Sequence, residues 1–149
     1  MDKSGVHIWL ILWKAYEAVN GCAMQSISSL DMCLSDFGIL EILLNKGPLP
    51  INDIGRKLSL TSGAITAAVD RLEKRNLVER SLSATDRRAR IVSLTKSGNK
   101  LITGAFNKHS EHMEDVFRSL TDRERQTLLS LLKKVGKEAE SLVAQKQLS

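Results

Sequence analysis

The sequence predicts a mainly α-helical protein with one small β-hairpin, and three observations support this fold class. Apolar residues recur at helical spacing over most of the 149 residues. Between Leu77 and Leu94, two short apolar segments flank a polar turn, which is the pattern of a hairpin. The length is that of one domain, with or without helical extensions. We therefore expect a compact helical lobe with a hairpin and additional long helices.

The first helix is expected from about Val6 to about Ser26, with its aromatic residues at helical spacing. Its start is apolar nearly all round, which indicates a helix that is buried on several sides. In so short a chain, a second copy of the protein is a natural cover. We therefore predict that residues 1–34 form an N-terminal dimerisation helix.

A second helix is expected from Asp36 to Asn45, ended by Gly47 and the prolines that follow. Two short helices come next, at Ile51–Leu58 and Ser62–Arg75, and Thr61 is the expected N-cap of the second one. Strands at 77–82 and 91–94 then form the hairpin, with a charged turn between them. Residues 35–98 are therefore predicted to form one lobe.

The remainder is predicted to be helical. One helix runs from about Lys96 to about Arg118, and Thr121 caps a last helix, with Glu124 completing a capping box. An apolar stripe on the last helix makes residues 99–149 the expected C-terminal dimerisation helices. The stripe consists of Leu128, Leu131, Leu132, Val135, Ala139 and Leu142.

The net charge of +5 is concentrated in one segment. Residues 56–90 hold nine basic and four acidic side chains, so that this segment carries the whole net charge. A neutral body with one basic segment favours a polyanionic partner such as nucleic acid. A solvated basic face without a partner is the competing interpretation of the charge alone.

Two helices followed by a hairpin inside this basic segment predict a winged helix-turn-helix. Ile65, Val69 and Leu72 fall on one face of the second helix, which is expected to pack inward. The opposite face begins with small and hydroxyl side chains, which allow close approach to base edges in the major groove. Bases further along suit phosphate contacts. The predicted contacts on the two helices are Arg56, Thr61, Ser62, Gly63, Ala64, Thr66, Ala67, Arg71 and Arg75.

The hairpin tip adds a second set of predicted DNA contacts, formed by Asp86, Arg87, Arg88 and Arg90. A basic loop beside a groove-reading helix suits the minor groove, where the potential is most negative. The acid is unusual at a DNA surface. We expect Asp86 to orient Arg88 by a charge-assisted hydrogen bond.

Several motifs together resemble the MarR family of transcription regulators, over nearly the whole chain. They are the stretches at 60–66 (LTSGAIT), 69–73 (VDRLE), 77–80 (LVER), 86–88 (DRR) and 92–95 (VSLT), with Gly98. Within the family, the chain is most similar to the branch associated with sensing quinones and phenolic compounds.

The resemblance implies an obligate dimer built from the first helix and the last two, which binds a pseudo-palindromic double-stranded DNA operator, usually to repress. It places the minor-groove arginine at Arg88, its partner at Asp86, and recognition contacts at Ser62, Gly63 and Thr66. A phenolic ligand or cysteine oxidation would change the spacing of the recognition helices and release the DNA. Half-sites on one DNA face lie about 34 Å apart, so a small change in the dimer prevents simultaneous contact.

Candidate effector residues also have simpler interpretations. An aromatic effector pocket could be lined by Trp9, Trp13, Tyr16, Met32 and Phe37, but the same residues could simply pack. Cys22 and Cys33 could sense redox state or be ordinary thiols. His109 and His112 lie three residues apart, which is only part of a metal site, so that we predict no metal.

Other function classes are less favoured. No phosphate-binding glycine loop and no catalytic constellation is present, so we predict no catalytic residues, no enzyme and no cofactor. A winged helix that binds protein instead of DNA is the alternative, although its basic tip would be unusual. The cysteines form no CxxC pair, which fits a reducing cytoplasm. The apolar run at 6–13 is too short to span a membrane.

Overall fold

The computed structural model describes residues 3–86 and 88–147. Arg87, predicted at the wing tip, therefore lies outside the described residues. The chain forms two compact units, Met1–Met113 and Glu114–Ser149. The boundary between the units lies inside a long helix, whereas the predicted boundary lies at residue 98. The division into dimerisation and DNA-binding parts is a statement about function and stays a prediction.

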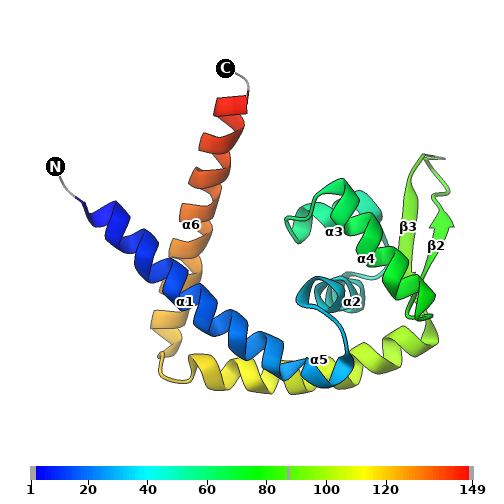
Figure 1. The fold of residues 1–149 in the computed structure, drawn as a ribbon, viewed down its shortest axis with the longest axis horizontal. Helices are drawn as coiled ribbons and strands as arrows, with labels where there is room; N and C mark the ends of the chain where they lie inside the picture. The colour runs from blue at the N-terminus through cyan, green and yellow to red at the C-terminus, as the bar shows by residue number, and fades with distance from the viewer. Residues whose placement is uncertain (1–2, 87, 148–149) are drawn as a thin grey trace. The chain divides into compact units, whose positions relative to one another are not determined.

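The predicted fold class is confirmed: the structure is mainly helical with a small antiparallel wing (Figure 1). The predicted helices are all present, with ends that differ by one or two residues. A short 3-10 helix, η1, was not predicted. The elements are α1 (Ser4–Ser26), η1 (Ser28–Leu30), α2 (Leu34–Lys46), β1 (Leu49–Pro50), α3 (Ile51–Lys57), α4 (Ser62–Lys74), β2 (Val78–Leu82), β3 (Arg90–Leu94), α5 (Lys96–Phe117) and α6 (Asp122–Gln147).

The three strands form one sheet in the order β1-β3-β2. β2 and β3 are the hairpin, in which Val78 pairs with Leu94 and Leu82 with Arg90. Arg90, predicted in the turn, therefore starts a strand. β1 was missed because Pro48 and Pro50 were interpreted only as a helix end. Proline is tolerated in an edge strand because such a strand leaves N–H positions unpaired.

The core of the first unit lies between α2, α3, α4 and the sheet, and Ile102 of α5 completes it. Ile65, Val69 and Leu72 of α4 are buried, which confirms the predicted inward face of that helix. α1 joins this unit through its last turn, where Ser26 Oγ lies 2.7 Å from Nδ1 of His109 on α5. The opposite face of α4 therefore remains available at the surface.

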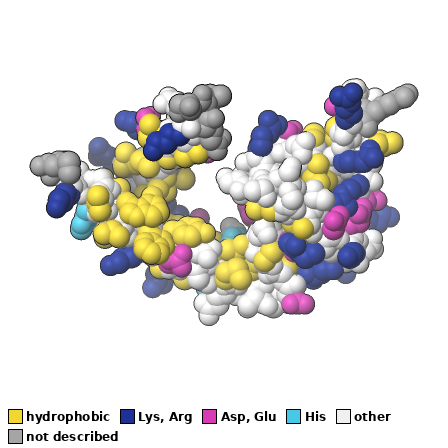
Figure 2. All heavy atoms as spheres, turned by 45° about the horizontal axis from the view of Figure 1, so that its top comes forward, with side chains coloured by type: hydrophobic (Ala, Val, Ile, Leu, Met, Phe, Trp, Pro, Cys, Tyr) yellow, Lys and Arg dark blue, Asp and Glu magenta, His cyan; other side chains and the backbone are white. Residues whose placement is uncertain are grey.

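Most of α1 carries exposed apolar side chains, and Figure 2 shows them gathered along this helix from the N-terminus onward. None of the residues of α1 is buried. Its large exposed apolar residues are Val6, Ile8, Trp9, Leu10, Ile11, Leu12, Trp13, Tyr16 and Met24. Despite this apolar surface, none of the helices in the described ranges is long and apolar enough to cross a membrane.

The second unit contains α6, and its start confirms the predicted capping box. The Thr121 backbone N–H and hydroxyl both donate to Glu124 Oε2 at 2.8 Å, and the Glu124 N–H donates to Thr121 Oγ1 at 3.4 Å. These bonds, the backbone one most, hold the pKa of Glu124 below its usual value. The apolar stripe of α6 is exposed. The large apolar side chains exposed on α6 are Leu128, Leu129, Leu131, Leu132, Val135, Leu142 and Val143.

Candidate nucleic-acid interface

The turn between α3 and α4 fixes the start of the predicted recognition helix. Ser59 adopts a left-handed backbone conformation with φ of 54°, and the Leu60 N–H donates to the Gly55 carbonyl at 2.8 Å. The Thr61 hydroxyl then accepts a hydrogen bond from the Ala64 N–H at 3.2 Å, as an N-cap residue does. The predicted N-cap is therefore confirmed, and α4 begins at a defined place on the surface.

The exposed face at the start of α4 carries only short side chains. Nothing lies within 4 Å of the position that a Cβ on Gly63 would take. The fold itself therefore does not require glycine there, which leaves close approach of an outside molecule as a reason for it. The first turn holds no acidic residue, so its N–H groups and the helix dipole favour an anion such as phosphate. The exposed residues of this face are Thr61, Ser62, Gly63, Ala64, Thr66 and Ala67.

The wing tip is held by hydrogen bonds to its own backbone. Ser83 Oγ accepts from the Thr85 and Asp86 N–H groups at 3.3 and 3.2 Å, and Asp86 Oδ1 accepts from the Arg88 N–H at 2.9 Å. We expected Asp86 to bond the Arg88 guanidinium, and this prediction is corrected. The carboxylate of an aspartate in a tight turn reaches the backbone amide two residues later more easily than it reaches the end of a long arginine side chain. Arg88 and Arg90 are exposed.

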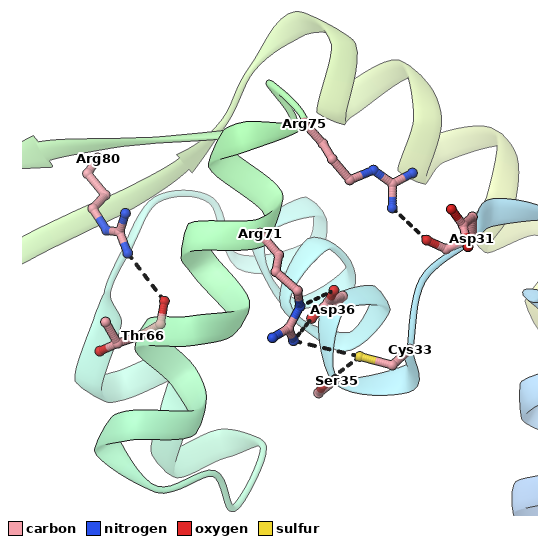
Figure 3. Close-up of polar contacts among 8 residues, drawn as sticks. All are labelled: Asp31, Cys33, Ser35, Asp36, Thr66, Arg71, Arg75 and Arg80. Atoms are coloured by element: carbon pink, nitrogen blue, oxygen red, sulfur yellow. Dashed lines mark hydrogen bonds and ion pairs between the residues drawn. The ribbon is translucent and has the colours of Figure 1, made fainter.

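Arg71 and Arg75, both predicted to contact phosphates, already have partners within the protein (Figure 3). Arg71 donates from Nη2 to Asp36 Oδ1 at 2.6 Å and from Nε to Oδ2 at 3.1 Å. The Asp36 side chain is 6% exposed, and its hydrogen bond raises the pKa of Arg71. Arg75 donates to the carbonyls of Asp31 at 2.9 Å and Leu30 at 3.0 Å. We therefore remove both arginines from the proposed DNA contacts.

On α3, Arg56 is exposed and forms an ion pair with Asp53, one turn earlier on the same helix. Exposed pairs of this kind contribute little to stability, so a phosphate could compete for the guanidinium. Arg56 therefore stays among the proposed DNA contacts.

Arg80 of β2 was missed by sequence reasoning. Its guanidinium bonds two carboxylates of α4, those of Asp70 and Glu73, at 2.5 Å each. The signal was present as two acids on the helix and an arginine on the next strand. Which of these charges pair with one another depends on how β2 packs against α4, which the net charge of the segment does not reveal.

A cavity of about 680 Å³ opens between the end of α1, the start of α2 and α4. Of the five predicted pocket residues, only Met32 lines it. Phe37 is 2% exposed and packs against His109 with the two ring centroids 4.9 Å apart, as a core residue does. Trp9 and Trp13 lie exposed on α1 and stack on each other, with their ring centroids 6.2 Å apart. Tyr16 is exposed on the same helix. The lining comprises Met24, Gln25, Ser28, Asp31, Met32, Cys33, Asp36 and Arg71.

The two cysteines differ in access. Cys22 is half-buried, whereas Cys33 is exposed and lines the cavity. The Cys33 sulfur lies 3.0 Å from Ser35 Oγ and 3.9 Å from Arg71 Nη2. An electrophile that entered the cavity would therefore meet Cys33 and not Cys22. In the described parts of the chain, no three His, Cys, Asp or Glu side chains gather as metal ligands would.

Comparison with known proteins agrees with this geometry. The sequence model of the MarR family matches residues 34–89. The transcriptional regulator MhqR of Bacillus subtilis is 32% identical over 136 residues, which cover 91% of this chain and 94% of MhqR.

Among solved structures, a probable transcriptional regulator from Pseudomonas aeruginosa superposes with a TM-score of 0.76 at 27% identity, covering 86% of this chain and 96% of its own. A cysteine-to-serine mutant of MarR from E. coli, solved with operator DNA, has the same fold, with a TM-score of 0.79 at 24% identity over 91% of this chain and 99% of its own. The chain therefore belongs to the MarR family of winged helix-turn-helix, DNA-binding transcription regulators and is not an enzyme.

Proposed function

We propose that this regulator binds a pseudo-palindromic operator as a homodimer and represses transcription until a small aromatic or phenolic compound, or oxidative or electrophilic stress, releases it. The observation that carries the operator contact is the pairing of a small-residue face on α4 with a wing that exposes Arg88 and Arg90. Short side chains let a helix approach base edges in the major groove, while a basic loop suits the minor groove. The proposed contacts are Arg56, Thr61, Ser62, Gly63, Ala64, Thr66, Ala67, Asp86, Arg88 and Arg90, with Arg87 outside the described residues.

The homodimer is supported by the apolar surfaces of α1 and α6. Trp9 is 58% and Leu131 54% exposed, and each belongs to a row of similar side chains. Monomeric proteins in water rarely expose contiguous apolar patches of this kind. A second copy of the chain would cover them, and it would also supply the second recognition helix that a pseudo-palindrome needs.

Release by an effector is supported by the cavity beside the start of α2. Met24 and Met32 give it apolar walls that suit an aromatic ring, and Arg71 is a cation at its edge. A quinone could also react with Cys33. The sulfur would bond to a ring carbon, the thiol proton would pass to one ring oxygen, and the hydrogen of that ring carbon would pass as a proton to the other oxygen, giving a hydroquinone adduct. Either event would act on the connection between α1 and α4.

A gel-shift titration against the DNA upstream of its own gene tests the proposal, at about 50 and about 200 mM salt. Tight, sequence-specific binding that weakens with salt is expected. Absence of specific binding under every condition would overturn the proposal and favour a protein-binding winged helix.

Phenolic acids, quinones and a peroxide are then added to the complex. Release by one class is expected, and Cys33→Ser separates the two routes. Release by quinones that survives this substitution indicates reversible binding, whereas its loss indicates the thiol adduct. If no compound released the DNA, the effector part of the proposal would fail.

A further inference from the structure

Arg80 lies in β2, yet its side chain is directed at the recognition helix instead of the solvent (Figure 3). Nη1 donates to Glu73 Oε2 and Nη2 to Asp70 Oδ1, both at 2.5 Å, and Nη2 also lies 3.4 Å from the Thr66 carbonyl oxygen. The Arg80 backbone N–H donates to Glu73 Oε1 at 3.3 Å. One residue of the wing therefore holds three successive turns of α4.

The arginine is well enclosed, because its side chain is only 21% exposed. Burial by itself lowers the pKa of Arg80, but the hydrogen bonds to Asp70 and Glu73 outweigh this effect and raise it. The planar fork of a guanidinium can serve two carboxylates at fixed angles, which an ammonium group cannot do. The contact is therefore directional.

The negative charges of Asp70 and Glu73 are unfavourable on a helix that binds DNA. They lie one and two turns beyond Thr66, and each would repel a nearby phosphate. Simple electrostatics predicts that removing two such carboxylates strengthens binding to any DNA. The network with Arg80 gives them a different task, which is to anchor the wing to the recognition helix.

We propose that Arg80 is a positioning residue for operator binding: through Asp70 and Glu73 it fixes the wing relative to α4, so that both reach their grooves together. This inference rests on the proposed placement of α4 and the wing on DNA. Asp70 and Glu73 then increase the preference for the operator over other DNA and do not increase the affinity for DNA in general. Their loss weakens binding to the operator and strengthens binding to unrelated DNA.

The test compares two duplexes of equal length: one selected from a random library by the unaltered protein, and one with a shuffled sequence. Operator affinity and shuffled-duplex affinity are measured for the unaltered chain and for Asp70→Asn/Glu73→Gln. The paired variant is expected to lose operator affinity about tenfold and to gain affinity for the shuffled duplex. Glu79→Gln, which removes the acid beside Arg80 in the sequence, is the matched control. It is expected to weaken neither the affinity for the operator nor that for the shuffled duplex.

A double-mutant cycle provides the second readout. Arg88→Ala is measured in the unaltered chain and in Arg80→Ala, at a temperature where circular dichroism shows both folded. If Arg80 positions the wing, Arg88→Ala costs less operator affinity when Arg80 is already absent. Arg80→Lys keeps the charge but not the fork, and is expected to restore less than half of the lost free energy of binding.

The outcomes separate the inference from the proposed function. If no preferred duplex is selected by the unaltered chain, the proposed function fails. If a duplex is selected but the paired acid variant binds both DNAs more tightly, the positioning inference fails and the acids are only unfavourable charges. Strict additivity of Arg80→Ala and Arg88→Ala, with full rescue by lysine, would also overturn it.

Discussion

At the scale of single residues, two side chains of the wing tip have different roles: Asp86 stabilises the turn, and Arg88 is exposed to the solvent. Asp86 does so by bonding a backbone amide. We predict that Arg88→Ala lowers operator affinity by about 1–3 kcal/mol while the dimer stays intact. Fluorescence anisotropy with labelled operator measures the affinity, and light scattering measures the mass. Unchanged affinity would refute the wing contact.

Asp86 offers a test of the turn itself. Asp86→Asn keeps an oxygen that can accept from the Arg88 N–H, whereas Asp86→Ala removes it. We predict that the asparagine variant binds operator as well as the unaltered chain or better, since a negative charge is lost near DNA. The alanine variant is expected to bind less tightly. Equal weakening in both variants would show that the charge, and not the turn, is what matters.

At the scale of elements, the junction of the wing and α5 leaves no space for a side chain at Gly98. A Cβ there would lie 1.8 Å from the Leu77 carbonyl oxygen. The Gly98 N–H also donates to Thr95 Oγ1 at 3.0 Å, so the helix start cannot shift freely. We predict that Gly98→Ala destabilises the fold by about 3 kcal/mol or more, since backbone must move. Thermal unfolding followed by circular dichroism measures the change.

Gly104, further along α5, is the matched control. A Cβ there meets nothing within 4 Å, so Gly104→Ala should stabilise the helix by up to about 1 kcal/mol. A loss of stability at both positions would mean that α5 is intolerant of substitution in general. A loss only at Gly98 assigns the effect to the contact with Leu77.

At this scale, the sequence could predict features that depend on residues close together in the chain, and it could not predict contacts between distant residues. The Thr61 cap, the Thr121–Glu124 box and the inward face of α4 depend on residues within one or two turns, so spacing alone is enough. The Arg71–Asp36 pair joins residues 35 positions apart, and β1 is a strand only because β3 lies beside it. No local pattern carries such information, so the pairing of Arg71 with Asp36 could not be predicted from the sequence.

At the scale of the whole molecule, the exposed stripe of α6 predicts that this helix is required for assembly. We predict that removal of the residues after Thr121 leaves no stable dimer, as measured by light scattering after gel filtration. Leu131→Glu/Leu132→Glu, at two exposed positions, should likewise give a monomer with helical content unchanged. Gln126→Glu adds charge to the opposite face of α6 and should leave the dimer. A dimer in all three proteins would refute the assignment.

The stacking of Trp9 on Trp13 has an optical consequence. The chain has two tryptophans and one tyrosine, and all three lie between residues 9 and 16 of α1. Intrinsic emission therefore reports on a single short stretch of helix, and the rest of the described chain contributes no indole signal. A change of wavelength on dilution would give a dissociation constant without a label. An effector that altered the emission at constant dilution would reveal that its signal had reached α1.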